Sequence, residues 1–153
     1  MRDDTLNRAR KRLDERLAAL KPVERFQPPP KGWVRAIRDA LGMSGAQLGA
    51  RLDVRPQTAD AIEKSEAAGT IQLNTLRRAA EALDCTLVYA LVPNTSLDSA
   101  VNARARQIAL RHLQRVAHTM KLEDQDTGNA DLEERIESYI RSVLKERDLW
   151  SEP

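Results

Sequence analysis

The sequence predicts a mainly α-helical protein, with a domain of four to five short helices between a helical N-terminal arm and two C-terminal helices. One observation is that apolar residues recur at three- and four-residue steps along most of the chain, the period of a helix with one buried face. A second is the run of three prolines at residues 28–30, which cannot continue a helix and separates the first helix from the rest. A third is a run of β-forming residues before Pro93, which predicts one short strand at about residues 86–92.

Composition excludes several classes of protein. The 153 residues are enough for one or two small domains, and the apolar (41%) and charged (31%) fractions suit an ordinary helical core. Only 3% of the residues are aromatic, which disfavours a stacking platform for single-stranded nucleic acid or RNA. No apolar run approaches the roughly 18–20 residues that span a bilayer, and the charged N-terminus lacks a signal-peptide core. We therefore expect a cytoplasmic protein without membrane contact.

The sequence has few residues that could form a disulfide, bind a metal or catalyse a reaction. The one cysteine, Cys85, excludes an internal disulfide framework, and its apolar neighbours indicate a core thiol. His112 and His118 are six residues apart, so they do not share a helix face for metal binding. The sequence has no nucleophile–base arrangement and no glycine-rich phosphate loop. We expect neither an enzyme nor a bound cofactor.

Residues 1–30 predict a helical arm and a proline-rich linker. Leu6, Leu13 and Leu20 lie seven residues apart and form the apolar stripe of one helix. Four prolines and a glycine follow in residues 21–32, and the triple proline favours an extended, semi-rigid spacer. We therefore expect the first helix to be an arm that a spacer joins to the remainder.

Residues 31–92 predict the central domain of short helices. Gly42 ends the first helix, and Ser44 and Gln47 form a candidate capping box at the start of the second. Pro56 suits the first turn of the third, where its missing amide hydrogen costs nothing. The apolar residues at helical spacing are Trp33, Val34, Ile37, Leu41, Ala46, Leu48, Leu52, Ala59, Ile62, Leu73, Leu76, Ala79, Ala80 and Leu83. The strand that follows could pair within the chain, across a twofold axis or with a partner protein.

Residues 93–153 predict two further helices, at about 96–121 and 130–148, which serve dimerisation or partner binding. Ser96 is a candidate N-cap of the first, and Asp98 suits the positive end of its dipole. The first half of this region carries five Lys or Arg against one acid, and the second half carries four against ten. The plainer interpretation of this contrast is two solvated helix faces that neutralise each other.

The second and third helices of the central domain lie about four residues apart. With a helix before and a helix after, they describe a helix-turn-helix unit. The third helix buries Ala59 and Ile62 but has short polar side chains on its other side. In a DNA reader that outer side lies in the major groove, with its N-terminal residues against base edges. Gln can pair with adenine, Arg with guanine, and Asp can accept from cytosine. The pattern therefore predicts a reader of double-stranded DNA.

Residues 33–92 resemble the lambda-repressor-like (Xre-type) helix-turn-helix family. The resemblance is carried by Gln47-Leu48-Gly49, Leu52, Val54, Ile62-Glu63-Lys64 and the run LRRAAEAL at residues 76–83. Over most of its length, including the segment LVYALVP and the helix after it, the chain more narrowly resembles the family called mobile mystery protein A.

The resemblance implies which residues touch DNA. It places at base-reading positions Arg55, Gln57, Thr58, Asp60 and Ala61. It places at phosphate-holding positions Ser44, Gln47 and Lys64. It also implies a homodimeric repressor of its own operon that binds an inverted-repeat operator. Two alternatives remain open from the residues alone, because Arg55 could pair with Asp53, and Asp60 with Lys64 at i+4.

Two features depart from the family's pattern. Gly49 stands where Ala is usual, which lowers helix propensity by up to about 1 kcal/mol but permits a closer approach between helices. Asp60 and Glu63 place acid near a polyanion, so the reading helix is not strongly basic. The electrostatic attraction would then come from elsewhere, from the N-terminal arm or from Arg104, Arg106, Arg111 and Arg115.

The narrower resemblance implies an alternative function. It is to the smaller member of a gene pair whose larger member carries a Fic domain, so the chain could be an antitoxin that binds and inhibits that Fic-domain protein. Inhibitory helices of that kind carry Ser or Thr, three residues, then Glu followed by Gly or Asn. Thr119 and Glu123 fit this motif, whereas Asp124 stands where Gly or Asn belongs. The plainer interpretation is the frayed end of a long helix.

Overall fold

The computed structural model describes residues 2–119 and 129–151. Over those residues the chain forms seven α-helices and two short 3₁₀ helices, and it contains no strand. The helices belong to two compact units. We call Lys21–Leu91 the central unit, and Met1–Leu20 together with Val92–Pro153 the terminal unit. The mainly α-helical prediction is confirmed, and none of the described helices is both long and apolar enough to cross a bilayer.

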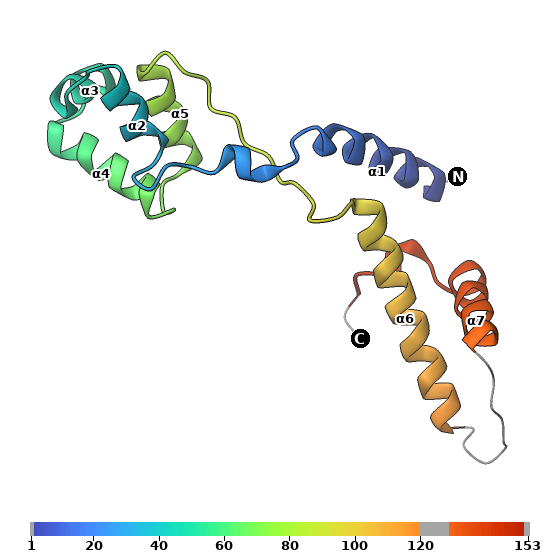
Figure 1. Cartoon of the computed structure of the whole chain (residues 1–153). Helices are drawn as coiled ribbons and strands as arrows, with labels where there is room; N and C mark the ends of the chain where they lie inside the picture. The colour runs from blue at the N-terminus through green and yellow to red at the C-terminus, as the bar shows by residue number, and fades with distance from the viewer. Residues whose placement is uncertain (1, 120–128, 152–153) are drawn as a thin grey trace. The chain divides into compact units, whose positions relative to one another are not determined.

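Four helices build the central unit, namely α2 (Trp33–Ala40), α3 (Gly45–Leu52), α4 (Pro56–Ala67) and α5 (Leu73–Ala82) (Figure 1). The short 3₁₀ helix η1 (Val23–Phe26) precedes them. One core cluster joins them, and its buried members are Val34, Leu48, Leu52, Ala79 and Leu83. All five belong to the apolar set expected from periodicity. Three larger members of that set stay exposed, namely Trp33, Leu41 and Leu73.

Local chemistry sets the helix ends in the central unit. Ser44 Oγ accepts a hydrogen bond from Gln47 N at 3.2 Å, and Gln47 Oε1 accepts one from Ser44 N at 2.7 Å. The predicted capping box at the start of α3 is therefore confirmed. Gly42 follows α2 with φ at +67°, a left-handed conformation that favours glycine. Pro56 occupies the first turn of α4, as predicted.

Three helices build the terminal unit, namely α1 (Arg2–Ala18), α6 (Leu97–Thr119) and α7 (Asn129–Ser142) (Figure 1). Both α1 and α7 pack against α6, and the 3₁₀ helix η2 (Glu146–Asp148) follows α7. The buried side chains of this unit are Ala105, Ala109, Ile136 and Leu149. The expected last helix is shorter than predicted, because a 3₁₀ turn replaces its final residues.

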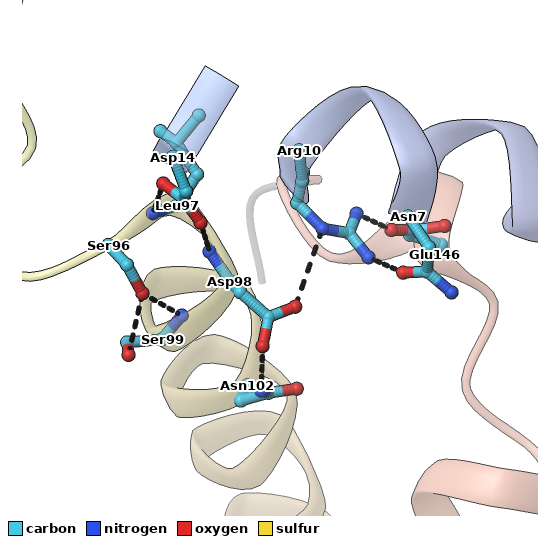
Figure 2. A network of polar contacts seen from close by, with 9 residues as sticks. All are labelled: Asn7, Arg10, Asp14, Ser96, Leu97, Asp98, Ser99, Asn102 and Glu146. Atoms are coloured by element: carbon cyan, nitrogen blue, oxygen red, sulfur yellow. Dashed lines mark hydrogen bonds and ion pairs between the residues drawn. The ribbon is translucent and has the colours of Figure 1, made fainter. Parts of the chain in front are cut away.

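The first helix is not the separate arm that the proline run suggested, because it is joined to α6 by polar contacts. Figure 2 shows the carboxylate of Asp14 at the first turn of α6, where it accepts hydrogen bonds from Leu97 N at 2.7 Å and Asp98 N at 3.1 Å. Arg10 forms an ion pair with Glu146, and its Nε lies 3.8 Å from Asp98 Oδ1. These partners are distant in sequence, which is why periodicity alone could not reveal the packing.

The strand predicted at residues 86–92 does not form. The segment after α5 is irregular over residues 85–93, and its large side chains Val88, Tyr89 and Leu91 are exposed. The physical reason is that β-propensity reports how a residue fits a sheet, not whether a neighbouring strand is available. No other strand exists in the described part of the chain, so these β-forming residues have nothing to pair with there.

Candidate nucleic-acid interface

A three-residue turn, Asp53 to Arg55, joins α3 to α4. Asp53 adopts the left-handed conformation with φ at 55° and ψ at 42°, which a short polar side chain tolerates. Val54 N then donates a hydrogen bond to Gly49 O at 2.9 Å. A Cβ at Gly49 would lie 2.9 Å from Val54 O. Glycine at this position therefore lets the backbone of the turn close against α3, whereas the sequence predicted a closer approach between helices.

Two acids of α4 face inward and hold this helix against α2. Glu63 is only 4% exposed and forms an ion pair with the guanidinium of Arg38, whose Nη2 lies 3.2 Å from Glu63 Oε2. One turn later, Glu66 caps α2, because its two oxygens accept hydrogen bonds from Trp33 N at 2.8 Å and Val34 N at 2.9 Å. The second half of α4 is thus anchored by charge-assisted hydrogen bonds.

The Arg38 guanidinium stays charged although its side chain is only 11% exposed. The hydrogen bond to Glu63 raises the pKa of Arg38 above its ordinary value, and this effect exceeds the opposing effect of burial. Arg38 Nη1 also donates to Met43 O at 2.7 Å. Glu63 therefore adds no free acid to the exposed side of α4, because its carboxylate points into the domain and pairs with Arg38 there.

The five residues expected at base-reading positions all lie exposed on α4 or at its start, namely Arg55, Gln57, Thr58, Asp60 and Ala61. In the described part of the chain, the side chains of Arg55, Gln57 and Thr58 have no hydrogen-bond or ion-pair partner. Arg55 is the N-cap residue of α4 and makes no side-chain capping bond. These three side chains are therefore available to an external ligand.

Asp60 and Lys64 pair with each other. Lys64 Nζ lies 2.6 Å from Asp60 Oδ2, and both side chains are at least half exposed. The i+4 pairing that the sequence left open is therefore present, while the Arg55–Asp53 alternative is not among the ion pairs of the described residues. An exposed pair of this kind contributes little stability, so either partner can exchange it for another contact.

The capping box leaves two outward donors at the start of α3. Because the Gln47 amide oxygen accepts from Ser44 N, its NH₂ group is left to donate. Because Ser44 Oγ already accepts from Gln47 N, its hydroxyl hydrogen is likewise left to donate. Both side chains are exposed. Donors of this kind suit phosphate oxygens, which accept only.

Four arginines of α6 were expected to supply electrostatic attraction to DNA. Two of the four side chains already have partners within the chain. Arg104 Nε donates to Leu149 O at 2.8 Å. Arg106 binds both oxygens of Glu133, with Nη1 2.6 Å from Oε2. This hydrogen bonding raises the pKa of Arg106 and lowers the pKa of Glu133. The side chains of Arg111 and Arg115 have no hydrogen-bond or ion-pair partner among the described residues.

Sequence reasoning missed the anchors Arg38, Glu66 and Gly32. Gly32 has φ at +85°, and a Cβ there would lie 2.7 Å from Glu66 Oε2. A signal did exist for the buried pair, because Glu63 follows buried Ala59 by four residues and so shares its face. An acid on an apolar helix face implies a buried cation. No comparable signal pointed to Glu66.

The candidate Fic-inhibitory motif begins at the end of α6. Thr119 is the last residue of this helix, and its Oγ1 donates to Arg115 O at 2.8 Å. Glu123, the second residue of the motif, lies outside the described residues.

Comparison with known proteins identifies the central unit. Residues 34–89 match the protein family described as Helix-turn-helix. The comparisons with curated proteins and with solved structures found no match. The matched residues include almost all of α2 to α5, so the match supports a helix-turn-helix domain of the broad lambda-repressor-like class in this part of the chain.

Proposed function

We propose that the chain is a homodimeric transcriptional regulator that binds an inverted-repeat operator and represses its own operon. The helix-turn-helix domain supplies the ligand class, double-stranded DNA. The observation that carries the proposal is the outer face of α4, where Arg55, Gln57 and Thr58 are exposed and without partners. Two of the three acids of the same helix face inward, so this face is open to DNA.

The proposed roles follow the chemistry of each side chain. Gln57 pairs with adenine through its amide, and Arg55 pairs with guanine through its guanidinium. Thr58 and Ala61 offer a methyl-sized apolar contact, which suits the methyl group of thymine. Asp60 either accepts from cytosine or stays paired with Lys64.

Phosphate contacts fix the domain on the duplex. We assign them to the hydroxyl of Ser44, the amide NH₂ of Gln47 and the ammonium of Lys64. Only Lys64 among these carries charge, and residues 31–92 hold eight Lys or Arg against seven acids. One domain therefore releases few counterions and binds weakly, since salt-dependent affinity scales with the phosphates neutralised.

Weak binding by one domain is the physical reason to propose a dimer. Two copies related by a twofold axis place two α4 helices in successive major grooves about 10 bp apart. The second contact then forms within one complex, which raises affinity without any new residue. Repression would be steric, through occupation of the promoter.

Selection of bound duplexes from a random pool tests this proposal, with the chain's own upstream DNA as comparison. We expect an inverted repeat with half-sites about 10 bp apart or a near multiple. Gln57→Ala should lose base preference at one or two positions, at a cost of about 1–3 kcal/mol. Gln72→Ala, at the start of α5, is the matched control and should keep every preference. A single unpaired half-site, or unchanged preferences in the Gln57 variant, would contradict the proposal.

The antitoxin role, and the narrower kinship with mobile mystery protein A, are a second proposal that is compatible with the first. It is favoured by the exposed position of Thr119 at the end of α6. Co-purification with the product of the neighbouring gene tests it. In this proposal Glu123→Gly releases a Fic-domain partner's activity and leaves DNA affinity unchanged. Absence of any complex would leave only the DNA-binding role.

A further inference from the structure

Residues 86–92 are a β-forming stretch that lacks a β partner. The sequence there is TLVYALV, and Val88, Tyr89 and Leu91 are 81%, 66% and 88% exposed. Among the described residues, no backbone hydrogen bond joins this stretch to any other segment. Exposed apolar side chains together with unpaired backbone groups form a template for strand pairing.

The ends of this stretch are symmetric about Tyr89. Cys85 N is already used, because it donates to Ala80 O at 2.8 Å at the end of α5. Pro93 has no amide hydrogen and cannot donate to a ladder. Both residues lie four positions from Tyr89. The longest ladder that the stretch can form is therefore centred on this tyrosine.

The stretch can pair antiparallel with a second copy of itself. Each side chain then faces one of compatible size and polarity. In the register centred on Tyr89, the two tyrosines face each other, Val88 faces Ala90, and Leu87 faces Leu91. Aromatic and aliphatic pairs of this kind stabilise neighbouring strands. The register places all three odd-numbered apolar side chains of each copy on one face of the ribbon.

Charge favours a second copy over a partner of another kind. No charged residue occurs between Asp84 and Asp98. Edge strands that avoid one another usually carry a lysine or another charge, and this stretch carries none. A neutral stretch also offers no charge complementarity to an acidic or basic partner, whereas it meets its own copy without repulsion.

We infer that residues 86–92 pair as an antiparallel strand with the same residues of a second copy, around a twofold axis at Tyr89. This inference rests on the proposed homodimer and assigns its contact. The last helix of each helix-turn-helix domain, α5, ends at Ala82, and three residues separate it from the ribbon, so the axis that relates the strands also relates the two α4 helices. A two-stranded ribbon is marginally stable by itself. The dimer should therefore dissociate on dilution and be reinforced by an operator with two half-sites.

Disulfide trapping in the full chain tests the register. Cys85→Ser is the common background, and it carries either Tyr89→Cys or Leu91→Cys. Residues opposed in an antiparallel ladder have Cα atoms about 4.5–5.5 Å apart, within the disulfide range of about 4.4–6.8 Å. Leu91 opposes Leu87, so it lies about 14 Å along the strand from its own twin. We expect Tyr89→Cys to cross-link at least tenfold faster than Leu91→Cys, although Leu91 is the more exposed side chain.

A second test, which needs no cross-link, places opposite charges at Tyr89 on the proposed twofold axis. Tyr89→Lys and Tyr89→Glu should each raise the dimer dissociation constant at least tenfold, because like charges then face each other. An equimolar mixture of the two should restore the dimer in sedimentation. Tyr89→Thr is the control, since threonine is a neutral β-former, and it should weaken the dimer less than either charge does.

Three results would overturn the inference: equal cross-linking at the two positions, a mixture no better than each charged variant alone, or a monomer at every concentration. Operator binding is measured in parallel to keep the two proposals separate. A chain that binds an inverted repeat as a dimer but does not cross-link at residue 89 loses only the strand pairing. A chain that cross-links there but shows no DNA preference loses only the regulatory function.

Discussion

Replacing Arg38 with methionine should strongly destabilise the central unit, because it removes one partner of a buried ion pair. Arg38 and Glu63 are 11% and 5% exposed at their side chains, so this is the most buried ion pair of the described residues. The substitution keeps most of the aliphatic stem but removes the guanidinium. Glu63 is then a buried carboxylate without a cation, and Met43 O loses its 2.7 Å hydrogen bond.

The expected loss is about 3–5 kcal/mol, the usual cost of removing one partner from a buried ion pair. Small domains unfold with about 5–15 kcal/mol, so this loss is a large part of the total. Arg35→Met is the matched control in the same helix. Its Nε lies 3.8 Å from Asp39 in a pair with side chains 39% and 58% exposed, so its removal should cost less than about 1 kcal/mol.

Urea unfolding followed by tryptophan fluorescence measures both changes. The chain has two tryptophans, of which Trp33 belongs to α2 and Trp150 follows η2 in the terminal unit. A Trp150→Phe background therefore lets Trp33 report on the central unit alone. The double variant Arg38→Met with Glu63→Leu should recover most of the stability, because an apolar pair replaces the buried charges.

Two results would refute this reasoning. A loss below about 1 kcal/mol for Arg38→Met would mean that Glu63 finds solvent or another cation, and that the pair does not anchor α4. A double variant no more stable than Arg38→Met would mean that the loss came from packing of the arginine stem.

Three further predictions concern other contacts. Gly49→Ala should destabilise the central unit by about 1–3 kcal/mol in the same urea assay, because backbone must move away from the new Cβ; Gly45→Ala, with nothing within 4 Å, is the control and should not destabilise. Asp14→Ala should cost about 0.5–2 kcal/mol through loss of the cap on α6, measured by Trp150 fluorescence in a Trp33→Phe background. Glu133 should titrate below its ordinary pKa of 4.5; its contribution to stability is present above that pH and is lost as pH falls through the lowered pKa. Arg106→Gln should return the pKa of Glu133 toward 4.5 in an NMR titration.

Elements whose cause is local could be predicted from the sequence. The capping box of Ser44 and Gln47, the glycine after α2 and the proline at the start of α4 each act within a few residues. The same holds for the inward faces of the central helices, since the 3.6-residue period depends only on neighbours. These features placed the candidate reading residues on the exposed side of α4 before any tertiary contact was known.

Features that depend on distant partners could not be predicted. The proline run indicated a free arm, yet Asp14 caps a helix that begins at Leu97. The run TLVYALV indicated a strand, but a strand also needs a neighbour, which propensity does not provide. Nothing in the sequence marked Glu66 as a helix cap, because its two amide partners in α2 lie more than 30 residues earlier.

The spacing of acids along α4 explains how this helix can be held against α2 and still present an exposed face to a ligand. Asp60, Glu63 and Glu66 are three residues apart, and each step of three turns the side chain back by about 60° around the helix axis. The series therefore moves from the exposed face at Asp60 to the face that contacts α2 at Glu66. All polar contacts with α2 fall in the second half of the helix, while Arg55, Gln57 and Thr58 lie free at its start. In the proposed regulator this division separates two kinds of variant. Arg38→Met should weaken binding to every duplex alike by depleting the folded domain, whereas Gln57→Ala should change which duplex is preferred.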